Sequence, residues 1–431
     1  MNTFIVYSIR AGLKLARGRY LKLLAWQIIA GMLVLSGCQT TAPMTKPAPE
    51  QPPRTESPKV EAPRVELPKS AAPEMGSGPP PLTRSAPPTT DVTRFPAAKN
   101  GKAAHKDYVE VEVFYATDRA ATGRPEPAKF YGTQRGNLQY GTATVSIPKG
   151  ERHKTGELES PVWWKFEFRE DPAKHIVLMS LTRMQNAAFY RKLQDASAAR
   201  DLFVFVHGFN VTFEDAVRRT AQIAYDLPFP GVPVTYSWPS QGSPKPFGYT
   251  TDEATVEWTE RHLKTFLKDL QARSGAKHIH LLAHSMGNRA LTKVLRSIAS
   301  EQPSPLFSQV ILAAPDIDAE VFERDIAPAM LRAANRFTLY ASSDDQALAA
   351  SKKVHGYPRA GQSGESLIVL SGLDTIDASG IDTSLLGHSY FAEQTSLVTD
   401  IFMLLRHGTP PNSRQLSPRQ KNGIPYWSIA H

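Results

Sequence analysis

The sequence contains a single cysteine in 431 residues. One thiol cannot form an intramolecular disulfide, a multi-cysteine zinc site or an iron–sulfur cluster, so those classes of site are excluded. Glycine-rich phosphate loops and the dinucleotide-binding fingerprint are also missing. His278 and His280 alternate along one apolar run without a third ligand nearby. We therefore predict that the protein needs neither a metal nor a cofactor.

Acidic residues are absent from residues 1–37. An apolar run at 23–35, broken only by Gln27, follows a stretch that holds five cations: Arg10, Lys14, Arg17, Arg19 and Lys22. A basic stretch ahead of a short apolar run is typical of a signal peptide, and the run is too short for a comfortable membrane span. Without these five cations the formal charge falls from +9 to +4. No basic stripe remains to indicate nucleic-acid binding.

The apolar run ends in the letters LSGC, whose last residue is Cys38. This arrangement resembles a bacterial lipoprotein signal, in which the cysteine is lipidated and becomes the mature N-terminus. Gln39 after it resembles the pattern that is sorted to a Gram-negative outer membrane. We therefore expect a signal peptide at 1–37, lipidation of Cys38 and a place in the cell envelope, at the outer membrane facing the periplasm. A buried structural cysteine is the alternative.

Residues 41–100 hold 15 of the 35 prolines and one aromatic residue, Phe95. They show no apolar periodicity. Such a segment cannot bury enough surface to offset the entropy lost on ordering, so we predict a disordered, partly polyproline-II tether over 38–106. The remaining residues, 107–431, are predicted to form one folded domain.

The folded part shows two patterns of apolar residues, one after the other along the chain. Period-two alternation at 109–115, 141–147 and 165–168 predicts antiparallel strands. Short apolar runs then alternate with helical stretches at 215–225, 253–273 and 289–301, which predicts a mostly parallel α/β sheet with helices on both faces. These runs are 201–206, 232–236, 278–283, 309–313, 336–340 and 366–370.

The run at 278–283 leads directly into His284, Ser285, Met286 and Gly287, and a helical stretch follows. A serine on a tight turn between a buried strand and a helix is typical of a nucleophile elbow, which requires small residues two before and two after the serine. Ala283 and Gly287 meet this requirement. We therefore predict that Ser285 is a nucleophile rather than a helix cap.

The run at 201–206 ends in the letters HGFN, residues 207–210, where the glycine lets backbone amides turn toward a substrate. With the elbow, this motif resembles the α/β-hydrolase superfamily. The resemblance implies that the backbone amides of Phe209 and Met286 hold the oxyanion, with Asn210 as an alternative donor. It also makes His207 a structural residue of the loop rather than a catalyst.

Six motifs narrow the resemblance and cover most of the chain beyond the tether: FYATDR at 114–119, YGTA at 140–143, VHGFN at 206–210, YSWPS at 236–240, LAAPDID at 312–318 and YASSDD at 340–345. Together they resemble a bacterial family of esterase/lipase-like α/β hydrolases known mainly by its sequences. This implies an α/β-hydrolase fold and a reaction class, and it leaves the natural substrate open.

The base of the triad must follow the nucleophile and the acid in chain order. Four histidines follow Ser285. We favour His388, in a loop after the last predicted strand and before the apolar helix at 397–406, over His355. His407 ends that helix and His431 ends the chain.

The orienting acid is less clearly marked. The resemblance favours Asp345, which follows the run at 336–340. Asp316, after the preceding run, is the main alternative, and Asp344 and Asp374 are further candidates.

The predicted function is a lipid-anchored serine hydrolase that cleaves small-molecule or lipid esters through an acyl-enzyme intermediate. The same triad cleaves amides, peptides and thioesters, so an amidase, peptidase or thioesterase is an alternative. A non-catalytic, envelope-binding lipoprotein is a third, and the intact set of serine, histidine and acid argues against it. The expected partners are the ester and the membrane, reached through the N-terminal lipid, and not nucleic acid.

Overall fold

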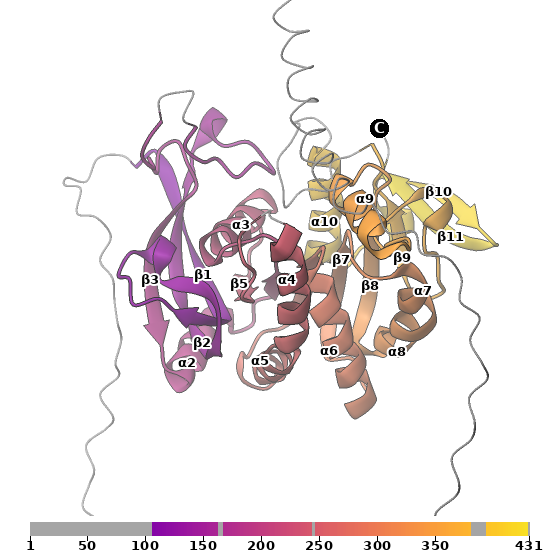
Figure 1. Ribbon diagram of the computed structural model, residues 1–431, viewed down its shortest axis with the longest axis horizontal. Coiled ribbons are helices and arrows are strands. Elements are labelled where there is room, and N and C mark those ends of the chain that lie inside the picture. The colour runs from indigo at the N-terminus through magenta and orange to yellow at the C-terminus, as the bar shows by residue number, and fades with distance from the viewer. Residues whose placement is uncertain (1–105, 163–166, 244–245, 381–393, 430–431) are drawn as a thin grey trace, which may run out of the picture. The chain divides into compact units, whose positions relative to one another are not determined.

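The computed structural model describes residues 106–162, 167–243, 246–380 and 394–429 (Figure 1). The chain divides into two units, residues 1–83 and 84–431, and every described residue belongs to the second. The predicted signal peptide, Cys38, nearly all of the tether and His388 therefore lie outside the described residues. None of the described helices is long and apolar enough to cross a membrane.

One sheet of 11 strands runs through the described part. Its strands are β1 (Tyr108–Ala121), β2 (Tyr131–Pro148), β3 (Val177–Met184), β4 (Leu202–Val206), β5 (Val232–Ser237), β6 (Ile279–His284), β7 (Phe307–Ala313), β8 (Ala334–Ala341), β9 (Asp374–Asp377), β10 (Leu416–Lys421) and β11 (Ile424–Ile429). The strand order is β10-β11-β9-β8-β7-β6-β4-β5-β1-β2-β3. The pairs from β11 through β9 to β1 are parallel, whereas β1–β2, β2–β3 and β10–β11 are antiparallel. This confirms the predicted fold class.

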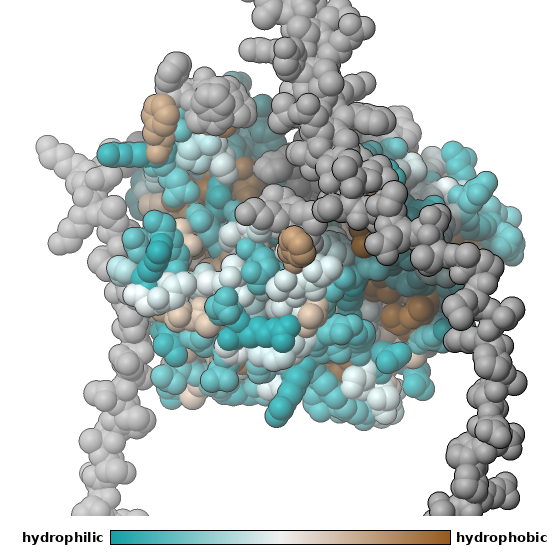
Figure 2. All heavy atoms as spheres, viewed as in Figure 1, coloured by the Kyte–Doolittle hydropathy of each residue, from teal (hydrophilic) through white to brown (hydrophobic). Residues whose placement is uncertain are grey.

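Helices cover both faces of the sheet (Figure 1). They are α2 (Asn186–Ser197), α3 (Phe213–Asp226), α4 (Pro246–Trp258), α5 (Glu260–Arg273), α6 (Gly287–Glu301), α7 (Ala319–Val321), α8 (Ala327–Met330), α9 (Gln346–His355) and α10 (Gln394–His407). The apolar residues of α2, α5, α6 and α8 pack on one face, and those of α3 and α10 pack on the other. Figure 2 shows that the outer side of α4, α5 and α6 is mostly hydrophilic, as expected of helices that bury one stripe.

The central strands are mostly apolar because neither of their faces meets water. In β4, Val204 belongs to the core under α5 and α6, while Phe203 and Phe205 belong to the core under α3 and α10. Strand β6 alternates in the same way, with Leu281 in the first core and Leu282 in the second. Their carboxyl ends meet at one edge of the sheet, where the predicted site residues follow.

Three expected elements differ from the structure. Residues 366–370 are not a strand: a short 3-10 turn, Gly364–Ser366, leads into irregular backbone, and the strand β9 follows. The run is apolar because Leu367 and Val369 are buried in a small cluster with Ala341, and burial alone does not supply ladder hydrogen bonds. Residues 167 and 168 are not in a strand, and 165–166 lie outside the described residues.

The predicted helix at 253–273 is two helices, α4 and α5, that meet at Thr259. The Thr259 hydroxyl is hydrogen bonded to Asp118 and to the Tyr236 hydroxyl, which ties this junction to the sheet. Sequence periodicity did not indicate the break, because the apolar pattern continues through it.

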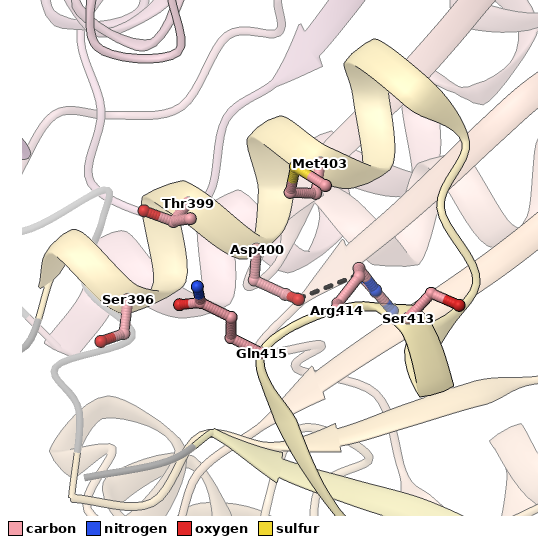
Figure 3. Close-up of a pocket in the computed structure, with 7 residues that line it drawn as sticks. All are labelled: Ser396, Thr399, Asp400, Met403, Ser413, Arg414 and Gln415. Atoms are coloured by element: carbon pink, nitrogen blue, oxygen red, sulfur yellow. Dashed lines mark hydrogen bonds and ion pairs between the residues drawn. The ribbon is translucent and has the colours of Figure 1, made fainter.

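The C-terminal hairpin, β10 and β11, is joined to α10 by a buried ion pair. Arg414 Nη1 lies 3.0 Å from Asp400 Oδ2, which also accepts a hydrogen bond of 2.6 Å from the Tyr340 hydroxyl. Burial raises the pKa of Asp400. The pair borders a cavity of about 240 Å³ between α10 and the turn before β10 (Figure 3). Within the described part, Asp400 Oδ1 and two guanidinium nitrogens of Arg414 have no hydrogen-bond partner.

Candidate active site

Ser285 lies in a two-residue turn between β6 and α6, and its φ is 47°. A non-glycine residue in this left-handed region costs on the order of 1–2 kcal/mol, so the surroundings must hold it there. The Ser285 amide donates to the carbonyl of Ala313 at 3.0 Å. The Ser285 carbonyl accepts from Asn288 Nδ2 at 3.1 Å and from the Asp316 amide at 3.3 Å. The turn has the form that the elbow motif predicts.

Two glycines allow the loop after β4 to touch this turn. A Cβ on Gly287 would lie 2.3 Å from the carbonyl oxygen of His207. A Cβ on Gly208 would lie 3.0 Å from the Cβ of Ser285. Both residues therefore serve close backbone approach.

The two amides predicted to bind an oxyanion have no competing acceptor in the part of the chain that the structure describes. Among the described residues, neither the Phe209 amide nor the Met286 amide donates a hydrogen bond. Free amides are expected at the start of α6, because the first turn of a helix has no intrahelical acceptors. The amide of Asn210, the alternative donor, lies 3.4 Å from Asp252 Oδ2. This arrangement favours Phe209 over Asn210 as the donor from this loop.

His207 is a buried structural residue of the loop after β4. Its ring is buried and stacks on Trp238 with centroids 5.1 Å apart. Its Nδ1 lies 2.9 Å from the Gly208 carbonyl, which can only accept, so Nδ1 carries the proton and Nε2 is an acceptor. Burial, with the charge of Arg119 next in weight, lowers the pKa of His207 well below its usual value. The imidazole is therefore neutral and fixed in place.

Arg119 is a buried cation under the same loop. Its guanidinium donates to the carbonyls of Val211 at 2.7 Å and Ser240 at 2.9 Å. Burial lowers the pKa of Arg119 to about 10, so it stays charged at neutral pH. Asp252 of α4 accepts from Ser240 Oγ at 2.5 Å and from the Gln241 amide at 2.8 Å. Ser240 is therefore hydrogen bonded to two buried groups of opposite charge, Arg119 and Asp252.

Asp316, the alternative acid, is a buried centre of hydrogen bonds. Its Oδ1 accepts from Arg359 Nε at 2.8 Å and Ser351 Oγ at 2.6 Å, and its Oδ2 accepts from Tyr249 Oη at 2.5 Å and Arg289 Nη2 at 3.2 Å. Burial alone would raise the pKa of Asp316, but the charges of Arg289 and Arg359 outweigh it and lower the pKa. No described histidine donates to either oxygen.

His355, the alternative base, is also engaged. Its Nε2 lies 2.8 Å from Glu253 Oε1, and its Nδ1 lies 2.8 Å from the Ser351 carbonyl. Because that carbonyl can only accept, Nδ1 carries a proton. Both ring nitrogens thus contact the α4–α9 junction. His407, at the end of α10, packs its ring against Phe402.

The predicted acid, Asp345, follows β8 at the carboxyl edge of the sheet. It is the N-cap of α9, with Oδ1 accepting from the Leu348 amide at 2.9 Å. Asp344 is exposed and accepts from the Gly380 amide at 2.6 Å, while Asp374 pairs with Arg336. His388 follows β9 but lies outside the described residues. Its contact with Asp345 and with Ser285 stays a prediction.

Sequence reasoning missed three residues of α4 that contact the site: Tyr249, Asp252 and Glu253. Their spacing of three and four residues places them on one side of a helix, which was the available signal. Their partners lie far along the chain, and that information is not in the spacing.

The described residues contain no group of three histidine, cysteine or acidic side chains placed to hold a metal ion. The prediction that the protein needs no metal stays a prediction.

One comparison with known proteins, the scan against family models, identifies a family. The family model described as "Alpha/beta hydrolase of unknown function (DUF900)" matches residues 183–406, just over half of the chain. No curated protein sequence matches.

Solved structures resemble the chain only distantly. One is from an analysis of two fungal esterases from Rhizomucor miehei, with 10% identity, 70% of this chain and 84% of that chain covered, and a TM-score of 0.31. Another is carboxyl esterase 2 from the mycorrhizal fungus Tuber melanosporum, with 10% identity, 71% and 76% covered, and a TM-score of 0.22.

Proposed function

Because the chain belongs to the α/β-hydrolase family of unknown function DUF900, we propose that it is a serine hydrolase that cleaves carboxylic esters through an acyl-enzyme intermediate. One observation carries the proposal: Ser285 lies in a strained turn between β6 and α6 that touches Gly208 of the loop after β4. The amides of Met286, in the turn, and Phe209, in the loop, have no acceptor among the described residues. Strain at a functional turn persists only where the surroundings enforce it. An ordinary helix-capping serine would not need a left-handed backbone.

In the proposed reaction, the Ser285 hydroxyl oxygen attacks the ester carbonyl carbon while His388 takes its proton. The carbonyl oxygen becomes an oxyanion that accepts hydrogen bonds from the amides of Phe209 and Met286. His388 then gives the proton to the leaving alcohol, and the acyl group stays on Ser285. Water, deprotonated by His388, releases the acid and restores the serine. Asp345 holds the histidine in the required tautomer.

A fluorophosphonate probe, which modifies activated serines, tests the nucleophile. We expect the wild-type protein to be labelled and Ser285→Ala to be unlabelled. Ser300→Ala is the matched control, because Ser300 is exposed on α6 and, within the described part, its hydroxyl donates only to the Ser297 carbonyl. A folded wild type that takes no label would refute the proposed catalysis.

The bond that is cleaved is tested with one panel of substrates. p-Nitrophenyl esters of graded chain length are compared with matched amides and thioesters at equal concentrations. We expect kcat/KM to be highest for the esters. Faster turnover of the amides or thioesters would reassign the enzyme to the corresponding class while keeping the same nucleophile.

We further propose that Cys38 carries a lipid that anchors the protein at the outer membrane, facing the periplasm. The support is the sequence pattern alone, since Cys38 lies outside the described residues. Metabolic labelling with a fatty-acid analogue should mark the wild type and not Cys38→Ser, and fractionation should place the wild type with outer membranes. Equal labelling of the variant would refute the anchor.

A further inference from the structure

Tyr249 of α4 contacts both halves of the candidate site through different parts of its side chain. Its ring packs against the Phe209 ring, with centroids 5.3 Å apart at 64°. Its hydroxyl lies 2.5 Å from Asp316 Oδ2 and 2.9 Å from Arg289 Nη2. Because arginine can only donate, the hydroxyl accepts from Arg289 and donates to Asp316. Burial, with the Asp316 charge next, raises the pKa of Tyr249, so this donor keeps its proton.

Asp316, which accepts from the Tyr249 hydroxyl, is itself hydrogen bonded to Ser285. Its own amide lies 3.3 Å from the Ser285 carbonyl, and its own carbonyl accepts from Arg289 Nε at 2.6 Å. Arg289 belongs to the first turn of α6, two residues beyond Gly287. The position of the elbow is thus coupled to Asp316, and Asp316 is coupled to the Tyr249 hydroxyl.

The same helix fixes the loop that carries Phe209. Asp252, three residues beyond Tyr249, is fully buried and accepts from the Asn210 amide. This contact directs the Asn210 amide toward α4, whereas the Phe209 amide has no acceptor among the described residues. The Tyr249 ring packs against the side chain of Phe209, the preceding residue of the loop. One helix therefore touches the loop at two successive residues.

We propose that Tyr249 is a positioning residue that sets the distance between the Phe209 amide and Ser285, which deepens the serine-hydrolase function proposed above and rests on it. The Tyr249 ring holds the loop that carries Phe209, and the Tyr249 hydroxyl holds that ring relative to the elbow through Asp316. Tyr249 does not enter the reaction. It acts by placing the Phe209 amide, whose hydrogen bond to the substrate becomes strong only when the oxyanion forms.

A donor that binds the oxyanion acts in the transition state and not in the ground state. Loss of its placement should therefore lower kcat and leave KM nearly unchanged. Complete removal of an oxyanion donor costs on the order of 10²–10³ in kcat. A misplaced donor retains part of that effect, so we expect a loss of about tenfold.

Tyr249→Phe tests the proposal because it removes only the hydroxyl and keeps the ring on Phe209. We expect kcat to fall about tenfold with KM within about twofold. The inhibition constant of a trifluoromethyl ketone, whose adduct with Ser285 carries an oxyanion, should rise by the same factor as kcat/KM falls. Tyr357→Phe is the matched control, since this tyrosine is exposed and makes no hydrogen bond in the described part.

A second variant keeps the test valid if Tyr249→Phe does not fold. Phe209→Leu keeps the backbone amide and removes the ring contact with Tyr249. We expect it to give the same separation of kcat from KM, and the double variant to lose less than the product of the two single losses, because both changes break one connection. Titration of labelled sites corrects every kcat for the active fraction.

The outcomes separate the two proposals. Wild-type kcat and wild-type inhibitor affinity in Tyr249→Phe would overturn the positioning role and leave the hydrolase intact. A lower labelled fraction with normal kcat per site would make Tyr249 purely structural and overturn the role as well. A wild type that neither labels nor hydrolyses would instead overturn the proposed function, and this role with it.

Discussion

Gly287→Ala offers a direct test of how closely the elbow and the loop after β4 must approach. The new Cβ would lie 2.3 Å from the His207 carbonyl oxygen and 2.9 Å from that of Val206. An ordinary contact begins near 3.4 Å, so the turn and the loop must separate by about 1 Å. Both contacts are with backbone, so no side chain can rotate away to relieve them.

The shift would reach the two predicted oxyanion donors directly. Met286 precedes Gly287, and Phe209 lies two residues after His207. A misplacement of about 1 Å costs on the order of 10²-fold in rate, so we expect kcat for p-nitrophenyl esters to fall by about that factor. Crowding of this kind also costs about 1–3 kcal/mol of unfolding free energy, which urea denaturation measures.

The control is Gly123→Ala. Its Cβ would meet nothing within 4 Å, although its φ of 81° carries its own strain. We expect this variant to lose stability of about 1 kcal/mol and to keep wild-type kcat. A folded Gly287→Ala enzyme with near wild-type kcat would refute the reasoning that this glycine sets the spacing of the two donors.

The remaining predictions concern charge. Asp345→Asn should lower kcat by about 10⁴ if this residue orients His388, while Asp344→Asn should change it little; the reverse result in steady-state kinetics would move the role to the neighbour. Burial alone would lower the pKa of His153, but hydrogen bonds to Asp226 and Glu159 outweigh it and raise the pKa to about 9. The pKa of His153 in the folded protein lies above its value in the unfolded chain, so protonated His153 stabilises the fold. This stabilisation is fully present below about pH 6.5 and is lost as the pH rises through about 9. Urea unfolding should show a loss of at most about 3 kcal/mol over that range, and His153→Gln should flatten it; an unchanged pH dependence in the variant would contradict this. Asp400→Ala leaves the buried Arg414 cation unpaired and should cost about 3–5 kcal/mol, and an unchanged urea midpoint would show that the ion pair does not hold the hairpin.

The parts of the site that sequence reasoning could predict are local. The elbow is a strand, a four-residue motif and a helix in direct succession, and the preferences of Ala283, Ser285 and Gly287 act within that stretch. The central strands are also local signals, because a run buried on both faces must be mostly apolar. The same rule misled at 366–370, where apolar residues are buried without entering the sheet.

The assignment of the acid shows where local information ends. Asp316 and Asp345 both follow strands of the parallel sheet, so chain order alone leaves both open. In the fold, the Asp316 carboxylate accepts from two arginines, a tyrosine and a serine, which come from α4, α6, α9 and the loop after α9. No pattern in the sequence around Asp316 specifies these partners.

The sequence by itself determined the succession of the parallel-sheet elements along the chain, the position of the elbow turn at Ser285 and the loop after β4, because each depends on residues adjacent in the chain. Only the tertiary structure decided that the Asn210 amide turns to Asp252, that His355 turns to Glu253 and that Tyr249 connects the loop to the elbow. These contacts join residues from 40 to 102 positions apart, the shortest separation being that of Phe209 and Tyr249. Such partners are chosen when the sheet brings distant segments together and each buried polar group must find an acceptor or donor there.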